Sequence, residues 1–558
     1  MAIRILDCTL RDGGHINASN FGKNVINGIT HKLFLSGVDY LEVGFLRSDI
    51  ECSSEDVAIF SSISQAERSI PSFDGSSRLV LMAQEDQFDI DRLEPCSKES
   101  RFKTIRVSFH DFDMESGLDF CKKVKERGYD VCINPINTPG YSDAALITLI
   151  GRINEIRPFA FTIVDTFGAM QPQDLRRIYY LVENNLSKDI AIGVHLHENL
   201  SLSFALAQEF AAIVRPSRVV IIDGSLNGMG RDPGNLSIEL MMDFLNTNNG
   251  AAYTVPEALE AIDEYIVPIR KKNPWGYSIT YWLSARHKVH RTYAEFLMQK
   301  GKLTIADINC ILDMIAKEKM TCYDGAYIER LYRQFMRVPV ESNAGLAAIK
   351  NEIAGKSVCV IAPGASLRNT KRRNTVLKTL PVDLTIAMNF CDKAIPCDFY
   401  FYTNQKRFNN DYLYVEKRRT ILSSNVRKNA EGVNTVLPFA LLSMHNGVYS
   451  DSSLLMVLNM LSCSGCCKVF LFGFDGFGNE INFYKPGYER SQNYDAHNED
   501  IARLLPDYRR KLSIEFASQS KYEQFCVGGE EKNMGKEMSD ERIYNNGGGY
   551  SIDKNVYS

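Results

Sequence analysis

The chain has 558 residues, of which 45% are hydrophobic, and a formal net charge of -4. This length predicts two or three domains with large cores. The near-neutral charge gives no electrostatic reason to expect nucleic acid or an anionic membrane as a partner, and no apolar run approaches the roughly 18 residues that span a bilayer. The N-terminus lacks the apolar core of a signal peptide, and the 14 cysteines follow no disulfide framework, so we expect a cytoplasmic protein.

Residues 1–225 alternate between short β-branched runs and amphipathic helical stretches such as 25–36 and 117–128. Eight such runs with crossovers predict a parallel sheet, and eight is the number that a (β/α)8 TIM barrel needs. A doubly wound open sheet is the alternative. We favour the barrel because polar residues recur just after several runs. The runs are Arg4–Asp7, Tyr40–Phe45, Leu79–Ala83, Thr104–Phe109, Val131–Pro135, Ala160–Asp165, Ala191–His195 and Val219–Asp223.

After the predicted barrel at 1–254, the sequence pattern of residues 255–340 is typical of helices and is rich in aromatic residues. We interpret this segment as a helical extension that covers an active site or forms a dimer surface, and we expect a homo-oligomer. A second, Rossmann-like α/β domain is predicted for 356–527, with strands near residue 356 and at 384–388, 399–402 and 468–472. The polar, glycine-rich tail at 528–558 is predicted to be disordered. Cys463, Cys466 and Cys467 are interpreted as small buried thiols rather than metal ligands.

The seventh run ends in the sequence HLH. His195 and His197 lie two residues apart on an extended chain, so both side chains point to one face, where two imidazoles can bind one cation. Asp12 follows the first run and offers a carboxylate to the same edge of a barrel. This donor set suits Mg²⁺, Mn²⁺ or a similar Lewis-acid ion. Asn235, in the loop after the eighth run, adds an amide oxygen or is a turn residue. Two ordinary strand-end histidines remain the alternative.

The segments TLRDGGH, GVHLHEN and PGN, in this order, resemble the metal-dependent lyase superfamily that includes hydroxymethylglutaryl-CoA lyase, isopropylmalate and homocitrate synthases and 4-hydroxy-2-oxovalerate aldolase. The resemblance covers roughly residues 1–245. It implies that Asp12, His195 and His197 are metal ligands and that Asn235 is a further one. It also implies that Arg11 stabilises a developing enolate and that Glu42 orients Arg11 or a metal-bound water; a structural salt bridge between Glu42 and Arg11 is equally compatible.

His15 points to the aldolase branch, because the Claisen-type members usually carry glutamine at this position. The resemblance implies that His15 removes the proton from the 4-hydroxyl of a 4-hydroxy-2-keto acid, a task that suits a histidine of near-neutral pKa. Cleavage of the C3–C4 bond then releases an aldehyde and a pyruvate enolate. The expected cofactor is Mn²⁺ or Mg²⁺, with Co²⁺ as a further option. The partners are a small 2-keto acid and an aldehyde.

Further polar residues at the ends of predicted strands are candidates for substrate contact or are ordinary strand ends. They are Arg106, Ser108, Asn134, Asn137, Asp165 and Thr166.

In the second half, APGASL, MNF, the segment from His445 and KVFLFGFDGF weakly resemble the CMP-sialic acid-using sialyltransferases of bacterial surface glycans and the related MptE-like domains. The resemblance implies a nucleotide-sugar or diphosphate site, with His497 as a candidate base. A noncatalytic domain is the alternative. The residues placed near that ligand are Gly364, Ser366, Asn389, Asn404 and Gly447.

Together the two halves predict a metal-dependent carbon–carbon lyase joined to a nucleotide-sugar-related domain, in surface polysaccharide biosynthesis. Two other functions stay open. One is a Claisen-type enzyme that uses acyl-CoA on the same barrel. The other is a degenerate barrel that supports a C-terminal glycosyltransferase; intact Asp12, His195 and His197 argue against it.

Overall fold

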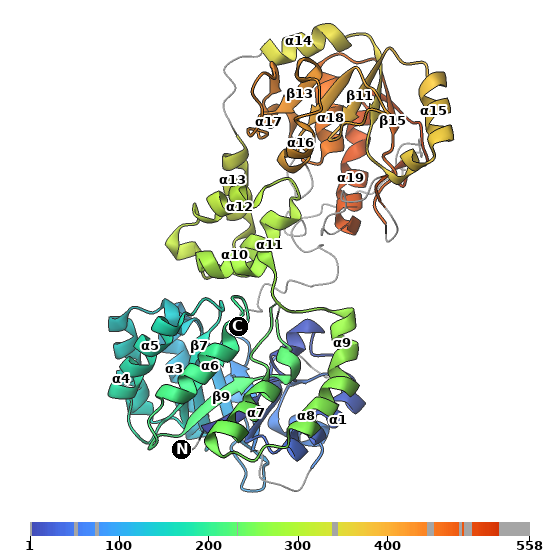
Figure 1. The fold of residues 1–558 in the computed structure, drawn as a ribbon. Helices are drawn as coiled ribbons and strands as arrows, with labels where there is room; N and C mark the ends of the chain where they lie inside the picture. The colour runs from blue at the N-terminus through green and yellow to red at the C-terminus, as the bar shows by residue number, and fades with distance from the viewer. Residues whose placement is uncertain are drawn as a thin grey trace. The chain divides into compact units, whose positions relative to one another are not determined.

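The computed structural model describes residues 3–49, 54–72, 78–231, 233–337, 344–443, 451–478, 482–484 and 494–523. The chain divides into two compact units, and the division falls after Arg291 (Figure 1). This point lies inside the segment 255–340 that the sequence groups as one helical extension, and the predicted domain bounds stay a prediction. The tail at 528–558 and Gly447 lie outside the described residues.

The first unit contains a closed barrel of eight parallel strands, which confirms the predicted fold class. The strand order is β1-β9-β8-β7-β6-β5-β4-β2, and pairing of β1 with β2 closes the ring. A two-residue strand, β3 (Ile59–Phe60), pairs with Phe45 and Leu46 at the end of β2 and was not predicted. The barrel strands are β1 (Ile3–Asp7), β2 (Tyr40–Leu46), β4 (Arg78–Gln84), β5 (Phe102–Phe109), β6 (Asp130–Pro135), β7 (Ala160–Asp165), β8 (Ala191–Leu196) and β9 (Val220–Gly224).

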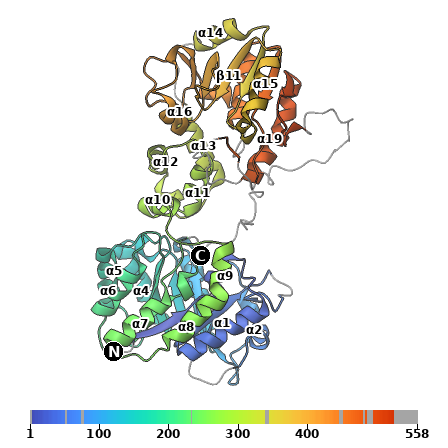
Figure 2. The ribbon, with the colours of Figure 1, turned by 45° about the vertical axis from the view of Figure 1, so that its right-hand side comes forward.

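Helices surround this barrel, and Figure 2 shows α7, α8 and α1 side by side on its outside. Their apolar faces pack against the strands in one large core. Helix ends follow ordinary capping rules: Ser142 Oγ accepts a hydrogen bond from the amide of Ala145 at the start of α4, at 3.2 Å. These helices are α1 (Lys23–Ser36), α2 (Ile63–Ser69), α3 (Met114–Glu126), α4 (Asp143–Ile156), α5 (Pro172–Asn185), α6 (Ser203–Ile213), α7 (Ile238–Asn249), α8 (Val255–Ala261) and α9 (Val267–Lys272). The first unit also contains α10 (Ile279–His287), whose residues are not part of this core.

A second apolar cluster forms inside the barrel. Because side chains alternate along a strand, most strands contribute one inward residue to it. Its buried members are Leu6, Cys8, Tyr40, Val80, Cys132, Ala160, Ala191 and Ile221. Most of them lie in the first half of their strands, and polar inward-facing residues lie nearer the carboxyl ends. In TIM-barrel enzymes the active site lies at these carboxyl ends.

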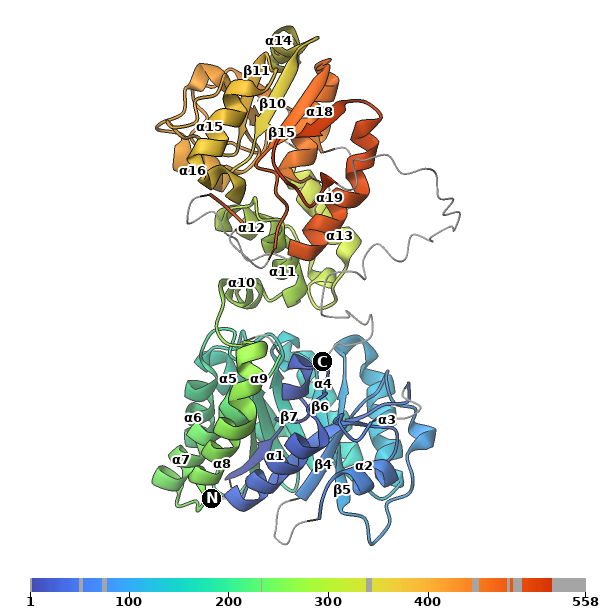
Figure 3. The same ribbon diagram turned by 90° about the vertical axis from the view of Figure 1, so that its right-hand side faces the viewer.

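The second unit is built on a seven-stranded parallel sheet of order β14-β13-β12-β11-β10-β15-β16. Figure 3 shows α15 on one face of the sheet and α18 and α19 on the other, as in a doubly wound fold. The order reverses between β10 and β15, so the carboxyl ends of these two strands flank a topological switch point. The strands are β10 (Ser357–Ile361), β11 (Leu384–Met388), β12 (Phe399–Tyr402), β13 (Thr420–Ser423), β14 (Thr435–Leu437), β15 (Lys468–Phe472) and β16 (Ser513–Phe516).

Helices α11–α13 precede this sheet within the same unit. The helices of the unit are α11 (Arg291–Gln299), α12 (Ile305–Leu312), α13 (Gly325–Met336), α14 (Ala344–Ile353), α15 (Thr370–Thr379), α16 (Gln405–Asp411), α17 (Phe439–Leu442), α18 (Ser453–Cys463) and α19 (Tyr494–Arg509).

The expectation for the cysteine cluster is partly wrong. Cys466 is buried, but Cys463 and Cys467 are exposed, since they end α18 and precede β15 at the surface. Among the described helices, none combines the length and the apolar character that a bilayer crossing requires.

Candidate active site at the barrel mouth

Asp12 lies in a tight turn directly after β1, where its backbone amide donates to the carbonyl of Cys8 at 2.8 Å. Its buried carboxylate accepts a hydrogen bond from Arg11 Nη1 at 2.8 Å and lies 3.1 Å from His195 Nε2. Burial by itself raises the pKa of Asp12, but Arg11 and His195 together lower the pKa well below its usual range. The carboxylate is therefore ionised at the mouth of the barrel.

The two histidines at the end of β8 lie beside this carboxylate, with their ring centroids 4.9 Å apart. His195 Nδ1 lies 3.2 Å from Asp223 Oδ2, and His197 Nδ1 lies 2.9 Å from the backbone oxygen of Asp165. These partners hold both rings in place, as second-shell acceptors do for metal-binding histidines. Burial and the neighbouring His195 lower the pKa of His197 to about 4, so His197 is neutral and retains a nitrogen lone pair.

Asn235 contributes the observation that best tests a metal at this site. It forms an isolated β-bridge with His197, and its Nδ2 donates to the carbonyl of Met229 at 3.1 Å. Its Oδ1 is buried and has no hydrogen-bond partner among the described residues. A carboxylate, two imidazoles and an unpaired amide oxygen form a donor set that suits a divalent cation. The residues present thus fit the metal that the sequence predicts.

Cys8 is a residue near this cluster that the sequence analysis did not single out. A sulfur of Cys8, an oxygen of Asp12 and a nitrogen of His195 all lie within 4.8 Å of one another. The thiol donates to the carbonyl of Gly224 at 3.2 Å, and burial raises the pKa of Cys8 well above its usual value. Because the thiolate is the form that binds metals, Cys8 is a weaker candidate ligand than Asn235.

A buried chain of ion pairs supports the site. Arg11 Nε donates to Glu42 Oε2 at 2.7 Å, and Arg106 Nη1 donates to the same oxygen at 3.1 Å. The other end of Arg106 pairs with Asp223, which also holds His195. Glu42 therefore orients Arg11, as the resemblance implies, and the predicted salt bridge between them is present. Arg106 is only 1% exposed, and two carboxylates occupy its guanidinium, so it belongs to this framework.

His15 follows the same turn as Asp12, and its ring makes an edge contact with Phe45 at a centroid distance of 5.6 Å. Burial, reinforced by the guanidinium of Arg231, lowers the pKa of His15 to about 3. The near-neutral pKa expected from the sequence is therefore wrong for the protein without substrate. The imidazole is neutral, with a lone pair for a proton but low intrinsic basicity.

The remaining predicted contact residues take local roles. The amide oxygen of Asn134, in its favourable orientation, accepts from Arg106 Nη2 at 2.6 Å. The backbone amide of Asn137 donates to Thr166 Oγ1 at 2.8 Å. Ser108 is buried, and its hydroxyl has no hydrogen-bond partner among the described residues. Of these residues, Ser108 has the hydroxyl that is least committed to the protein's own bonds.

Sequence reasoning missed Asp223 as a functional residue. It is the next-to-last residue of β9, after three apolar residues, and its carboxylate holds both Arg106 and His195. An acidic residue at the end of a buried barrel strand is itself a signal, because burial of an unpaired carboxylate is costly. Asp165, expected to contact substrate, instead closes its own loop by accepting the backbone amides of Ala169 and Met170 at 3.0 Å.

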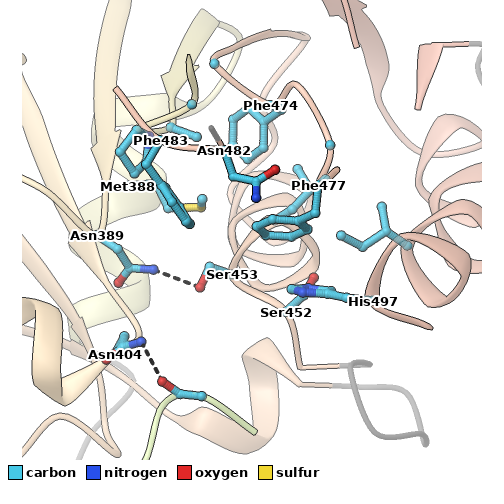
Figure 4. Close-up of a pocket in the computed structure, with 18 of the residues that line it drawn as sticks. Met388, Asn389, Asn404, Ser452, Ser453, Phe474, Phe477, Asn482, Phe483 and His497 are labelled. Atoms are coloured by element: carbon cyan, nitrogen blue, oxygen red, sulfur yellow. Dashed lines mark hydrogen bonds between the residues drawn. The ribbon is translucent and has the colours of Figure 1, made fainter. Parts of the chain in front are cut away.

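A pocket in the second unit lies at the switch point, with about 1040 Å³ of empty space that includes open solvent. Gly364, Asn389, Asn404 and His497 line it, as the sequence analysis expected of a ligand site (Figure 4). Ser366 is committed elsewhere: its amide and hydroxyl each donate to the carboxylate of Asp475 at 2.7 Å.

Most of these residues also have structural tasks. A Cβ on Gly364 would lie 2.1 Å from the backbone oxygen of Gly473, so this glycine permits close packing of the loops after β10 and β15. Asn389 Nδ2 donates to Ser453 Oγ at 2.7 Å, and Asn404 caps α16. His497 stacks on Phe477 at 4.8 Å, and burial lowers its pKa to about 4, so it is neutral.

Comparison with known proteins relates the barrel to one family. The HMGL-like family model matches residues 2–263. The 4-hydroxy-2-oxovalerate aldolase 2 of Salinispora arenicola is 28% identical over 265 residues, which cover 47% of this chain and 74% of that protein. The oxaloacetate decarboxylase of Mycobacterium tuberculosis is 23% identical over 279 residues, covering 50% of this chain and 80% of that protein. The solved HMG-CoA lyase of Brucella melitensis has 12% identity and a TM-score of 0.39, covering 48% of this chain and 99% of that chain. The barrel, residues 2–263, is therefore the part of this chain that matches the HMGL-like family.

Proposed function

We propose that the barrel is a divalent-metal-dependent aldolase that cleaves or forms the C3–C4 bond of a 4-hydroxy-2-keto acid. The observation that carries this proposal is the approach of His195 to Asp12 at 3.1 Å, with His197 beside His195 and Asn235, whose amide oxygen is unpaired, bridged to His197. The low-identity match to 4-hydroxy-2-oxovalerate aldolases supports the same reaction class.

Asp12, His195, His197 and Asn235 are the residues that would hold the metal. A bound Mn²⁺, Mg²⁺ or Co²⁺ would supply Lewis-acid polarisation of the 2-keto carboxylate. The chain supplies a second positive charge through Arg11, which Glu42 and Asp12 fix from two sides at 2.7 and 2.8 Å. Because Arg11 is already oriented, it stabilises negative charge that develops on the keto oxygen with little reorganisation.

His15 is the proposed base of the cleavage direction. Its neutral imidazole accepts the proton of the 4-hydroxyl while the C3–C4 bond breaks and its electron pair moves into the pyruvate enolate. The aldehyde leaves, and protonation of the enolate at C3 gives pyruvate. The low pKa of His15 in the free protein means that this transfer relies on electron flow towards the keto oxygen rather than on a strong base.

The second unit is proposed to be a nucleotide-sugar-related domain, which would connect the lyase to surface polysaccharide biosynthesis. Support comes from the pocket at the switch point of its doubly wound sheet, where such folds bind ligands.

A pyruvate-release assay across 4-hydroxy-2-keto acids with Mn²⁺, Mg²⁺ and Co²⁺ tests the lyase proposal. We expect His195→Ala to lose bound metal and at least about 100-fold in rate while staying folded, since it removes a ligand. His31→Ala, an exposed histidine of α1, is the matched control and should keep full activity. Full activity of His195→Ala would contradict the proposal. Thiol release from acetyl-CoA would favour the Claisen-type enzyme instead, and a chain that binds no metal and lacks both activities would be a scaffold.

A further inference from the structure

The loop between α11 and α12 forms part of the wall of the switch-point pocket in the second unit. Lys300, Gly301 and Lys302 all line the pocket. Asn404 Nδ2 donates to the backbone oxygen of Gly301 at 3.2 Å, which ties this loop to the start of α16 (Figure 4). The pocket is therefore a composite of the sheet edge and a helical segment that comes before the sheet in the chain.

Lys302 has an unusual environment for a cation. Its side chain is 7% exposed, and its Nζ donates to the backbone oxygen of Asp451. Its other close neighbours are Met456 Sδ at 3.1 Å and Asp451 Oδ2 at 3.7 Å. A thioether is a weak acceptor, and Asp451 also accepts the hydroxyl of Tyr332. A buried ammonium with such partners is stabilised further by an anionic oxygen from the pocket.

The rest of the lining favours an anion on the same side. Arg407 adds a second cation, whereas Lys300 pairs with Glu329 at 3.0 Å and Asp475 directs its carboxylate to Ser366 and Ser518. The turn at Gly364 is therefore next to a carboxylate, which disfavours a phosphate there. The cationic residues, and not the predicted turn, are the better phosphate-binding group.

Aromatic rings form another part of the lining. Figure 4 shows Phe474, Phe477 and Phe483 grouped together, with the amide of Asn389 and the hydroxyl of Ser453 across the pocket from them. The rings of Phe477 and Phe483 have centroids 6.1 Å apart and an interplanar angle of 59°. His497 and Tyr494 already stack on Phe477, at centroid distances of 4.8 and 4.9 Å, so Phe477 meets a planar ligand through its edge.

We propose that this pocket binds a nucleoside phosphate, with Lys302 contacting the phosphate and Phe477 contacting the base. This inference rests on the role proposed for the second unit and deepens it. It places the phosphate-binding residue in the loop between α11 and α12, a loop that the sequence analysis did not identify as part of a ligand site.

Calorimetric titration of the full chain tests the proposal, with CMP, UMP and AMP as ligands and the matching nucleosides and inorganic phosphate as their separated halves. We expect at least one nucleotide to bind, and its matching half-ligands to bind at least about tenfold more weakly. Lys302→Gln and Phe477→Leu should each weaken the nucleotide by about tenfold or more. Lys371→Gln, an exposed lysine of α15, and Tyr414→Leu, a tyrosine that is 72% exposed, are matched controls and should bind as the wild type does.

The outcomes separate the two claims. If no nucleotide binds to the wild-type chain at millimolar concentration, the role proposed for the second unit fails. If a nucleotide binds but Lys302→Gln and Phe477→Leu bind it unchanged, only the present inference is overturned. Far-UV circular dichroism establishes that each variant is folded. Should Lys302→Gln not fold, Phe477→Leu and competition by inorganic phosphate still decide the question.

Discussion

At the scale of single residues, Asp223 is the most informative position outside the proposed ligands. Its carboxylate holds the ring of His195 and the guanidinium of Arg106 in one buried network. We expect Asp223→Asn to weaken the apparent affinity for Mn²⁺ by about 10–100-fold, because the ring loses its charged acceptor. The concentration of Mn²⁺ that half-activates pyruvate release measures this effect. Asp91→Asn, at an 88% exposed side chain, makes the same chemical change and should leave activation unaltered; an equal loss there would contradict the assignment.

The same residue marks what the sequence can tell at this scale. The spacing of His195 and His197 predicts that both rings share a face, and the structure brings them beside Asp12. The hydrogen-bond acceptors of the two rings cannot be predicted in this way. Asp223 and Asp165 lie on other strands, and only the pairing of these strands with β8 brings them to the histidines. Ser366 is the clearest case: its acceptor, Asp475, lies 109 residues away along the chain.

At the scale of elements, β2 depends on a glycine that also positions a site residue. Gly44 has a φ of 154°, and a Cβ there would lie 2.2 Å from the backbone oxygen of Ala58. Glu42, the acceptor for Arg11, precedes it by two residues, and the register of β2 against β4 shifts between Glu42 and Phe45. We expect Gly44→Ala to lower the free energy of unfolding by about 2 kcal/mol or more and to reduce pyruvate release. Urea unfolding measures the first effect.

Gly151 provides a control of opposite sign. It lies within α4, and a Cβ added there meets nothing within 4 Å. Since alanine favours a helix interior over glycine, Gly151→Ala should raise the free energy of unfolding by roughly 0.5–1 kcal/mol. A destabilisation by both variants to the same extent would show that backbone strain at Gly44 is not the cause.

Strand length explains which elements the sequence predicts. The barrel strands are five to eight residues long and rich in apolar residues, so the sequence indicates where they lie. By contrast, β3 has two residues and β14 has three, and β16 is exposed at alternate positions at the sheet edge. Such short edge strands are defined by their neighbours rather than by their own composition.

At the scale of the whole molecule, each unit has its own sheet, its own hydrophobic core and its own candidate site. The sequence predicts both folds, but it groups residues 255–340 as one helical segment, whereas the two units divide after Arg291. The helices after residue 254 have similar composition throughout, so composition alone does not reveal that the division falls after Arg291. What assigns each helix to a unit is the surface against which it packs.

This division has a thermodynamic consequence. A ligand that binds only the folded form of one unit stabilises that unit by RT ln(1 + [L]/Kd), about 2.7 kcal/mol at a hundredfold excess over Kd. If the units unfold independently, Mn²⁺ should raise the temperature of one calorimetric transition by on the order of 5–10 °C, and a bound nucleotide should raise the other. Asp12→Asn should abolish the Mn²⁺ shift and leave the nucleotide shift intact, because Asp12 belongs only to the first unit. A single transition that both ligands raise together would instead mean that the two units unfold as one cooperative body.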